Sequence, residues 1–371
     1  MATNSMQARI QVAIIGYGAA GKVFHAPIIS GVRGLQLACI CTSKADVVHA
    51  DWPQVRTVPT PEGVWRDASI DLVVIASPTN THHALAKAAL LAGKHVVIDK
   101  PCTVTLAETA HLLAVAKAQQ RTLTVFQNRR FDADFLALQQ VLASGQLGRI
   151  VHFESHFDRY RVVLPSKWRE QDIPGSDLWL DLGAHLVDQA LQLFGVPDDI
   201  MLDLAQQRDN TLTNDYFHAQ LRYPSQPNTT QSSLRVVLHA SSCVTTSGPR
   251  FSVHGTQGSF TKYGLDVQED ALKAGARPQL NNLGDWGRDP LVGTIALQPS
   301  GGPANWSASL AAPDVPGNYL QYYVQLRDHL LGQGSAPVTT QQVHQVMAML
   351  SRGEQSAREG RFVATADLVD G

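Results

Sequence analysis

The stretch Arg9–Gly21, RIQVAIIGYGAAG, decides the fold of the first part of the chain. It begins as a short run rich in Val and Ile that stops at Gly16, which is typical of a buried strand. Gly16, Gly18 and Gly21 then lead into a helix, the spacing found where a strand-to-helix turn binds a dinucleotide. In that order, such glycines permit a tight turn, a close approach to pyrophosphate and close helix–strand packing. The candidate cofactor turn comprises Gly16, Gly18, Ala19, Ala20 and Gly21.

Strand and helix patterns alternate from this turn to residue 127. Further short runs with the composition of buried strands lie at Leu35–Thr42, Asp71–Ser77, His95–Asp99 and Thr122–Gln127. Between them, His82–Ala92 and Leu106–Gln119 have the composition and apolar spacing of amphipathic helices. This rhythm predicts a doubly wound α/β domain over residues 1–127, with a parallel sheet covered on both faces. It also favours the dinucleotide site over the alternative, an ordinary glycine turn.

Residues 128–371 have a different pattern. Strand patterns follow one another at Val151–Phe157, Tyr216–Tyr223, Leu234–Ala240, Arg250–His254 and Ser259–Tyr263. Consecutive strands favour an antiparallel sheet, so we expect an α+β second domain over residues 128–371, closed by helices at Tyr319–Leu331 and Gln341–Glu359. Ala274–Ala312 is rich in Gly, Pro and Asn, and its sequence leaves open whether it is an ordered excursion or a mobile loop.

The composition bounds the class of protein. The chain has 371 residues, which favours two domains, and 44% of them are hydrophobic. Its net charge of −2 and the lack of a basic run disfavour nucleic acid as a partner, and a small molecule is expected instead. No apolar run is long enough for a membrane span. The four cysteines form no disulfide framework, and Met1–Arg9 lacks an apolar core, so we expect no secretory signal and a cytoplasmic protein.

The end of the second strand bears on the choice between NAD and NADP. An acidic residue about 20 positions after the glycines would bind the ribose 2′-hydroxyl of NAD. This chain has Thr42, Ser43 and Lys44 there, two hydroxyls and a cation that suit a 2′-phosphate. The pattern favours NADP. NAD stays an alternative because Asp46 lies nearby, and Lys44 is then a solvated surface lysine.

Two further stretches carry candidate catalytic groups. Lys100 follows a predicted strand, where an ammonium can stabilise a developing alkoxide; the alternative is a surface lysine at a strand exit. Asp181 and His185 are four residues apart and share one face if the segment is helical. His185 is then a candidate acid/base, and Asp181 a group that orients it or binds substrate hydroxyls. The alternative is a capping aspartate with a buried histidine, and Asp188 is a third polar group or a solvated one.

No set of residues has the spacing expected of a metal site. The rings of the neighbouring His82 and His83 cannot both point to one face of a helix, so zinc binding there is disfavoured. Arg129, Arg159 and Trp168 lie in segments that could line a polyol site, with structural ion pairs and a core tryptophan as the alternative.

Several of these motifs, in this order, resemble the glucose–fructose oxidoreductase / inositol dehydrogenase / rhizopine catabolism (Gfo/Idh/MocA) family. They are Gly16–Gly21, the turn Ser77–His82, Asp99-Lys100-Pro101 and Asp181–His185. Four further stretches are similar to the branch of NADP-dependent scyllo-inositol dehydrogenases: Phe126–Asp132, Glu154–Arg161, Trp168–Glu170 and Gly255–Asp266. The resemblance covers nearly the whole chain. It implies a Rossmann domain followed by a domain with a large, mainly antiparallel, open-faced sheet, and a homodimer or larger homo-oligomer.

The resemblance also implies roles for single residues. Lys100 matches the lysine that contacts cofactor and substrate, while Asp181 and His185 match a pair whose histidine accepts a proton. The turn Ser77–His82, with Ser77, Pro78, Thr79 and His82, matches the turn near the nicotinamide ribose. Two positions depart from the family pattern: Thr79 replaces an asparagine, and Asp99 replaces a glutamate.

Together these features predict an NADP-preferring dehydrogenase or reductase of a sugar, inositol or related polyol or keto compound. Such an enzyme needs no metal. Two alternatives remain open: a cofactor-recycling, sugar-converting enzyme of the same family, and a non-catalytic protein that senses a dinucleotide. The presence of Lys100, Asp181 and His185 favours an enzyme over a sensor.

Overall fold

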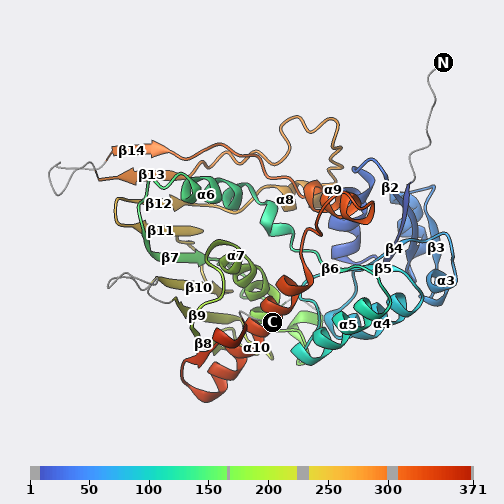
Figure 1. The fold of residues 1–371 in the computed structure, drawn as a ribbon, viewed down its shortest axis with the longest axis horizontal. Coiled ribbons are helices and arrows are strands. Elements are labelled where there is room, and N and C mark those ends of the chain that lie inside the picture. Colours follow the sequence, from blue (N-terminus) through green and yellow to red (C-terminus); the bar gives the residue numbers. More distant parts are fainter. Residues whose placement is uncertain (1–8, 165–167, 224–233, 299–307, 369–371) are drawn as a thin grey trace. The chain divides into compact units, whose positions relative to one another are not determined.

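The apolar run after Arg9 forms the first strand of a parallel sheet in a computed structural model of the chain (Figure 1). The structure describes residues 9–164, 168–223, 234–298 and 308–368. The expectation of no secretory signal concerns residues that, apart from Arg9, lie outside this described part. Contacts divide the chain into two units. The first unit comprises residues 1–128, 268–286 and 318–343, and the second comprises residues 129–267, 287–317 and 344–371.

The first unit has a six-stranded parallel sheet in the order β3-β2-β1-β4-β5-β6, the arrangement of dinucleotide-binding folds. Its strands are β1 (Ile10–Ile15), β2 (Leu35–Cys41), β3 (Arg56–Val58), β4 (Leu72–Ile75), β5 (His95–Ile98) and β6 (Leu123–Val125). β4 is buried at every position, as a strand covered on both faces must be.

Helical segments connect these strands. They are η1 (Ala20–His25, a π-helical turn), α1 (Ala26–Ser30), α2 (Ala45–Asp51), α3 (Glu62–Trp65), η2 (Thr79–Thr81), α4 (His82–Leu91) and α5 (Leu106–Ala118). A capping box, in which Thr105 and Glu108 bond each other's backbone amides, begins α5. The predicted doubly wound α/β architecture is therefore confirmed.

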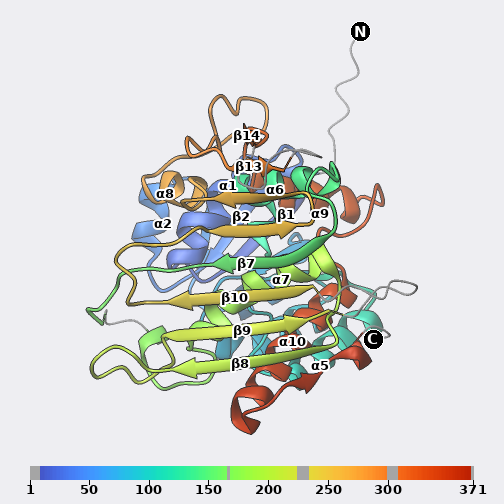
Figure 2. The ribbon, with the colours of Figure 1, turned by 90° about the vertical axis from the view of Figure 1, so that its left-hand side faces the viewer.

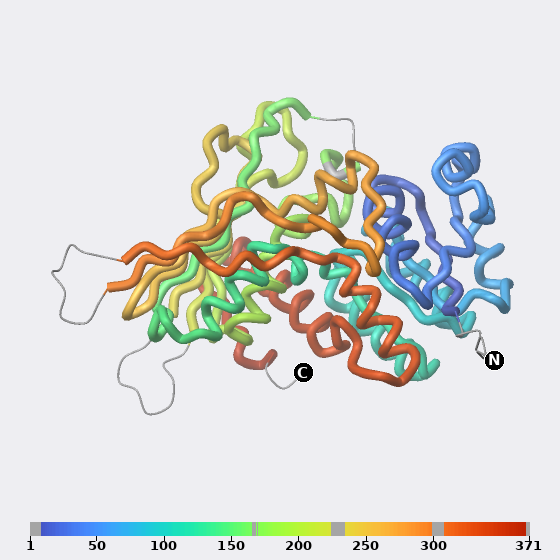
Figure 3. The backbone as a smooth tube through the Cα atoms, turned by 90° about the horizontal axis from the view of Figure 1, so that it is seen from above, coloured from blue at the N-terminus to red at the C-terminus, as the bar shows by residue number. Residues whose placement is uncertain are grey.

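Two later segments of the chain, residues 268–286 and 318–343, complete this unit, and their path can be followed along the tube in Figure 3. They carry α8 (Gln268–Lys273) and α9 (Leu320–Leu330). Tyr322 and Tyr323 of α9 are fully buried, and their rings pack against Phe126 at centroid distances of 4.9 and 5.7 Å. The hydroxyl of Thr124 donates to the carbonyl of Val338. The boundary predicted between residues 127 and 128 stays a prediction.

The second unit has a nine-stranded sheet in the order β14-β13-β12-β11-β7-β10-β9-β8-β15 (Figure 2). Its strands are β7 (Ile150–His156), β8 (Asp199–Ala205), β9 (Tyr216–Arg222), β10 (Arg235–Ser241), β11 (Phe251–Gly255), β12 (Gly258–Lys262), β13 (Thr294–Leu297), β14 (Ala308–Ala311) and β15 (Val363–Ala364). Neighbours pair antiparallel except β7 and β10, which are parallel. The expected large, mainly antiparallel sheet is confirmed.

Helices cover one face of this sheet. The helical segments are η3 (Asn128–Phe131), α6 (Ala133–Ala143), η4 (Trp168–Glu170), η5 (Trp179–Gly183, a π-helical turn), α7 (Ala184–Phe194), α10 (Thr340–Glu359), whose first turn belongs to the first unit, and η6 (Ala366–Leu368). Phe153 of β7 packs on Phe194 of α7, so the residues that alternate with Phe153 point to the other face. Figure 2 shows strands β7 to β10 in front and α7 behind them.

The excursion at residues 274–312, left undecided by its sequence, contributes β13 and β14 at one edge of the sheet. Residues 299–307 of this segment lie outside the described part. Within the described residues, no helix is long and apolar enough to cross a membrane.

Candidate functional site

The glycine turn after β1 has the geometry that a dinucleotide requires. Gly16 has a φ of +98°, and a Cβ there would lie 2.6 Å from the carbonyl oxygen of Ala76. A Cβ on Gly21 would lie 2.2 Å from the carbonyl oxygen of Gly16, so only glycine allows this helix to pack so closely. Gly18 differs, because a Cβ there would meet no atom within 4 Å. The turn therefore leaves open space at Gly18, the position that lets a pyrophosphate approach the backbone in dinucleotide-binding turns of this spacing.

A polar cluster lies beside this turn, and sequence reasoning missed it. The hydroxyl of Tyr17 donates to Asp51 at 2.9 Å, and the ammonium of Lys22 lies 2.8 Å from the same carboxylate. Hydrogen bonds from Lys22 and Tyr17 lower the pKa of Asp51. Because these partners join the glycine turn to the end of α2, they hold the turn in place. Lys22 stands one position after the glycine motif, but nothing in the sequence pairs it with Asp51.

The tip of β2 carries the residues that suggested a 2′-phosphate. The amide of Thr42 donates to Val58 of β3, while its hydroxyl accepts the amide of Lys44. Ser43 and Lys44 are exposed, and no carboxylate of the described residues pairs with Lys44. Asp46 is also exposed, in the first turn of α2. The tip of β2 therefore presents two hydroxyls and an ammonium, and no carboxylate before Asp46.

His82 connects the loops that follow β4 and β5. Its side chain is 1% exposed, and Nε2 lies 2.9 Å from the carbonyl oxygen of Ser77. Nδ1 lies 3.1 and 3.3 Å from the carbonyl oxygens of Pro101 and Cys102. Burial lowers the pKa of His82, so the ring is neutral and only one of its nitrogens donates. Both ring nitrogens face backbone carbonyls, so one of them donates a hydrogen bond to one loop while the buried ring packs against the other.

Lys100 is half-buried and follows β5, at the carboxyl edge of the parallel sheet. The preceding residue, Asp99, faces the imidazole of His25 across 3.7 Å. His25 is fully buried, and its Nδ1 lies 2.7 Å from the hydroxyl of Tyr323. Burial acts to raise the pKa of Asp99, but the hydrogen bond and charge of His25, together with the charge of Lys100, outweigh it and lower that pKa. A carboxylate is thus maintained next to Lys100 even though it is one methylene shorter than the family's glutamate.

In the second unit, Asp181 lies in the π-helical turn η5 and His185 in the first turn of α7. Trp179 anchors this segment: it is fully buried, and its Nε1 donates to the carbonyl of Leu350 at 3.0 Å. A Cβ on Gly183 would lie 2.4 Å from the Trp179 ring, so glycine is required between the two polar residues. His185 is 4% exposed. A π-helical turn interrupts the helix here, as is common at functional sites.

The capping role that was the alternative for Asp181 belongs to Asp177, whose carboxylate accepts the amide of Leu180 at 2.8 Å. Asp188 is not a solvated group. It is 1% exposed, and its carboxylate receives two hydrogen bonds from Arg130, at 2.6 and 2.8 Å. This buried pair holds α7 against the segment before α6.

Other residues in segments considered for a substrate site have structural partners in the second unit. Arg129 donates to Asp132 at 3.1 Å, and its guanidinium lies over the ring of Phe157. The guanidinium of Arg159 lies over the same ring, 4.6 Å from its centroid. Trp168 begins the short turn η4. The arginines thus show the ion pair and stacking contacts of the structural alternative.

Comparison with known proteins identifies the family. Residues 10–127 match the family model described as the NAD-binding Rossmann fold of an oxidoreductase family, and residues 139–365 match that family's C-terminal α/β domain. The chain belongs to the Gfo/Idh/MocA oxidoreductase family. Gfo/Idh/MocA relatives cover nearly its full length, and the Rossmann match supports a nicotinamide cofactor.

Three relatives illustrate this membership. The uncharacterised oxidoreductase YdgJ of Escherichia coli is 48% identical over 95% of this chain and 98% of its own. The scyllo-inositol 2-dehydrogenase (NADP⁺) IolW of Bacillus subtilis is 34% identical, covering 95% of each chain. The solved structure of the YPO2259 protein of Yersinia pestis is 45% identical, with a TM-score of 0.89 over 98% of this chain and 99% of that one. The oxidoreductase assignment therefore applies to both units.

Proposed function

We propose that this protein is an NADP-preferring dehydrogenase or reductase that acts on a CH–OH group of a sugar, an inositol or a related polyol or keto compound. The observation that carries the proposal is the open space at Gly18, in a turn whose other two glycines are required by close backbone contacts. Similarity to IolW supports the substrate class, and Thr42, Ser43 and Lys44 at the tip of β2 support NADP over NAD.

When bound, the dinucleotide supplies the redox chemistry by taking or giving a hydride at its nicotinamide ring. The protein's own residues position the reactants and handle the proton. We assign Lys100 to the substrate oxygen, where its ammonium stabilises alkoxide character. His185 takes the hydroxyl proton in oxidation and returns it in reduction, and Asp181 orients His185 or a neighbouring substrate hydroxyl. His82 is a positioning residue, because its neutral ring lies between the loops that follow β4 and β5 and donates to a backbone carbonyl of one of them.

The roles of the catalytic residues are tested by K100M and H185N, with K117M as a control for an exposed lysine of α5. We expect each single variant to lower kcat about 10²- to 10⁴-fold, as losses of a general base or an oxyanion stabiliser do. The double variant should lose much less than the product of the two, because residues that act on one reacting atom are not additive. Normal turnover in either single variant would refute its role.

The substrate class and cofactor are tested by following NADPH or NADH absorbance with a panel of inositols, aldoses and their keto forms. Reduction of NADP with a polyol is the expected result. Turnover with NAD alone would contradict the cofactor assignment. Substrate conversion without net NADPH would indicate the cofactor-recycling alternative, and dinucleotide binding without turnover on any compound would indicate a sensor.

We further propose that the protein acts in the cytoplasm as a homodimer or larger homo-oligomer. All four cysteines are free, which fits a reducing compartment. Sedimentation of the purified protein measures the assembly, and a monomer at micromolar concentration would contradict it. Fractionation of the source cells tests the compartment.

A further inference from the structure

The helix-free face of the nine-stranded sheet carries a row of histidines that the proposed reaction does not use. Because Phe153 and Phe157 of the β7 segment are buried on the helix side, His156 and Asp158 point to the other face. His239 of β10 is the direct neighbour of His156 in the parallel register. These side chains therefore lie on the face opposite α7, the helix that carries His185.

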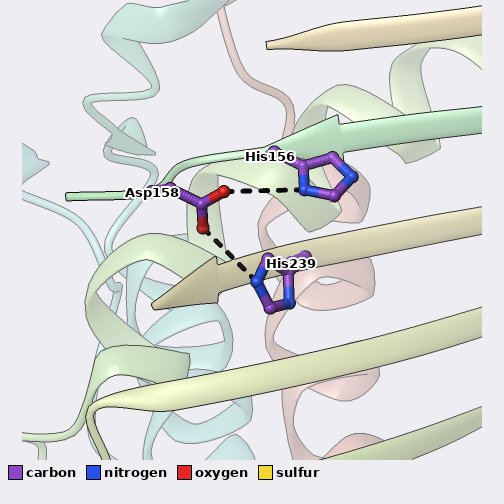
Figure 4. A group of neighbouring side chains, drawn as sticks. All are labelled: His156, Asp158 and His239. Carbon is purple, nitrogen blue, oxygen red and sulfur yellow. Dashed lines mark ion pairs between the residues drawn. The ribbon is translucent and has the colours of Figure 1, made fainter. Parts of the chain in front are cut away.

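His156, Asp158 and His239 form a compact cluster, and Figure 4 shows the Asp158 carboxylate between the two rings. Nδ1 of His156 lies 3.7 Å from Oδ2 of Asp158, and Nε2 of His239 lies 3.4 Å from Oδ1. Both distances exceed the usual 2.7–3.2 Å of an N–H···O hydrogen bond. One ligand atom from each of the three side chains lies within 4.8 Å of the other two, so small side-chain rotations bring all three within bonding distance of one ion.

The surroundings orient these groups as metal ligands are oriented. Nε2 of His156 lies 3.0 Å from Glu154, whose other oxygen lies 2.7 Å from His152. A histidine that gives its N–H to a carboxylate keeps its other nitrogen free for an ion, the arrangement found behind zinc-bound histidines. The amide of Ser241 donates to Asp158 at 3.2 Å and fixes that carboxylate.

The charges favour a cation at this point. Glu154 and Asp158 place two carboxylates beside the imidazole of His156. The facing groups on the neighbouring strands are Tyr216 and His218, whose rings lie beside His239, and no lysine or arginine pairs with Asp158 among the described residues.

We propose that His156, Asp158 and His239 bind a divalent transition-metal ion, with zinc as the expected ion, at a site separate from the oxidoreductase centre. Two imidazoles and one carboxylate are a ligand set that zinc accepts, and three protein ligands leave a fourth position for water. The sequence conceals this set because His239 lies 81 positions after Asp158 and reaches it only through the parallel β7–β10 pairing.

The test is titration of chelator-stripped, tag-free protein with Zn²⁺ by calorimetry. We expect one ion per chain, and we expect D158N and H239Q each to weaken binding at least tenfold. H254Q is the matched control, because His254 lies on the same face in β11 and is exposed, outside the cluster. The Zn²⁺ affinity of H254Q should stay within twofold of that of the unaltered protein.

Absence of saturable binding, or a loss of less than tenfold in H239Q, would overturn the proposal. An equal loss in H254Q would also overturn it, because binding would then be a general property of the histidine-rich face. Circular dichroism in the presence of chelator verifies that each variant is folded. If D158N does not fold, the tenfold loss of zinc affinity expected of H239Q decides the test alone. The readout does not depend on dehydrogenase activity, so the proposed function stands or falls separately.

Discussion

Gly18 and Gly21 in the turn after β1 predict opposite responses to the same substitution. In G18A the added methyl enters open space, so folding is unaffected or gains up to about 1 kcal/mol from a less flexible unfolded chain. In G21A the methyl would lie 2.2 Å from the carbonyl oxygen of Gly16, which is 0.8 Å short of the 3.0 Å that real Cβ atoms keep. Moving the helix to relieve this overlap costs about 1–3 kcal/mol.

For NADPH binding, we expect the direct effect of G18A to be the larger one, although G21A is the more harmful substitution for folding. The methyl of G18A occupies the space through which a pyrophosphate reaches the backbone amides, and one charge-assisted hydrogen bond is worth about 1.5–3 kcal/mol. We therefore expect NADPH affinity to fall about 10- to 150-fold in G18A, with the melting temperature unchanged or slightly raised.

The assay pairs a thermal melt without dinucleotide with a fluorescence titration of NADPH. G21A is the comparison, because it should melt earlier for reasons of packing alone. If G18A melts normally and binds NADPH within twofold of the unaltered protein, the space at Gly18 is not where the diphosphate lies, and the assignment of this turn is refuted.

Three further predictions test other parts of the structure. K44E should reverse the preference of NADP over NAD, since a carboxylate at the tip of β2 repels a 2′-phosphate; an unchanged ratio of kcat/KM values would contradict the assignment of Lys44. D188A should lower the free energy of unfolding by about 3–5 kcal/mol, because it leaves the guanidinium of Arg130 buried without its carboxylate. In contrast, D314A in the exposed Arg288–Asp314 pair should cost less than about 1 kcal/mol in the same denaturant titration. Burial, with the charge of Asp177, raises the pKa of Glu354 to about 7. Between pH 4.5 and 7 the folded state therefore keeps a proton that the unfolded chain has lost. The free energy of unfolding consequently falls as the pH rises through this range. In E354Q this fall in the free energy of unfolding should be smaller by about 1–2 kcal/mol, a figure reduced for the screening by solvent at a half-buried group. Parallel pH profiles of the free energy of unfolding for E354Q and the unaltered protein would contradict this.

The first sheet could be predicted because its signals are local. Five of its six strands are short, largely buried runs, and the glycines of the turn mark close backbone contacts. β3 has no buried residue and was not predicted. β8, β13, β14 and β15 were not predicted, and for β13 and β14 the reason is a weak local signal. β14 is an edge strand with mostly exposed residues, and β13 is four residues long, so neither carries much alternation of apolar and polar positions.

In the candidate site too, residues in local motifs could be predicted from the sequence, whereas partners distant in the sequence could not. Lys100 and His185 stand in recognisable motifs, but His25, which keeps Asp99 ionised, stands in a helix and pairs across 74 positions. Asp188 was read without its partner because Arg130 lies 58 positions earlier. A spacing rule describes neighbours on one helix or strand and carries no information on contacts made by the fold.

The division of the first unit among three stretches of chain has a consequence for synthesis on the ribosome. Tyr323 lies against His25, and Val338 accepts from Thr124, yet these partners emerge about 300 and 210 residues apart. The nucleotide-binding half therefore stays unfinished until almost the whole polypeptide has been translated. A nascent chain that stalls after β6 exposes Phe126 and the fully buried His25 to chaperones and proteases, so quality control can recognise an incomplete product by its N-terminal half.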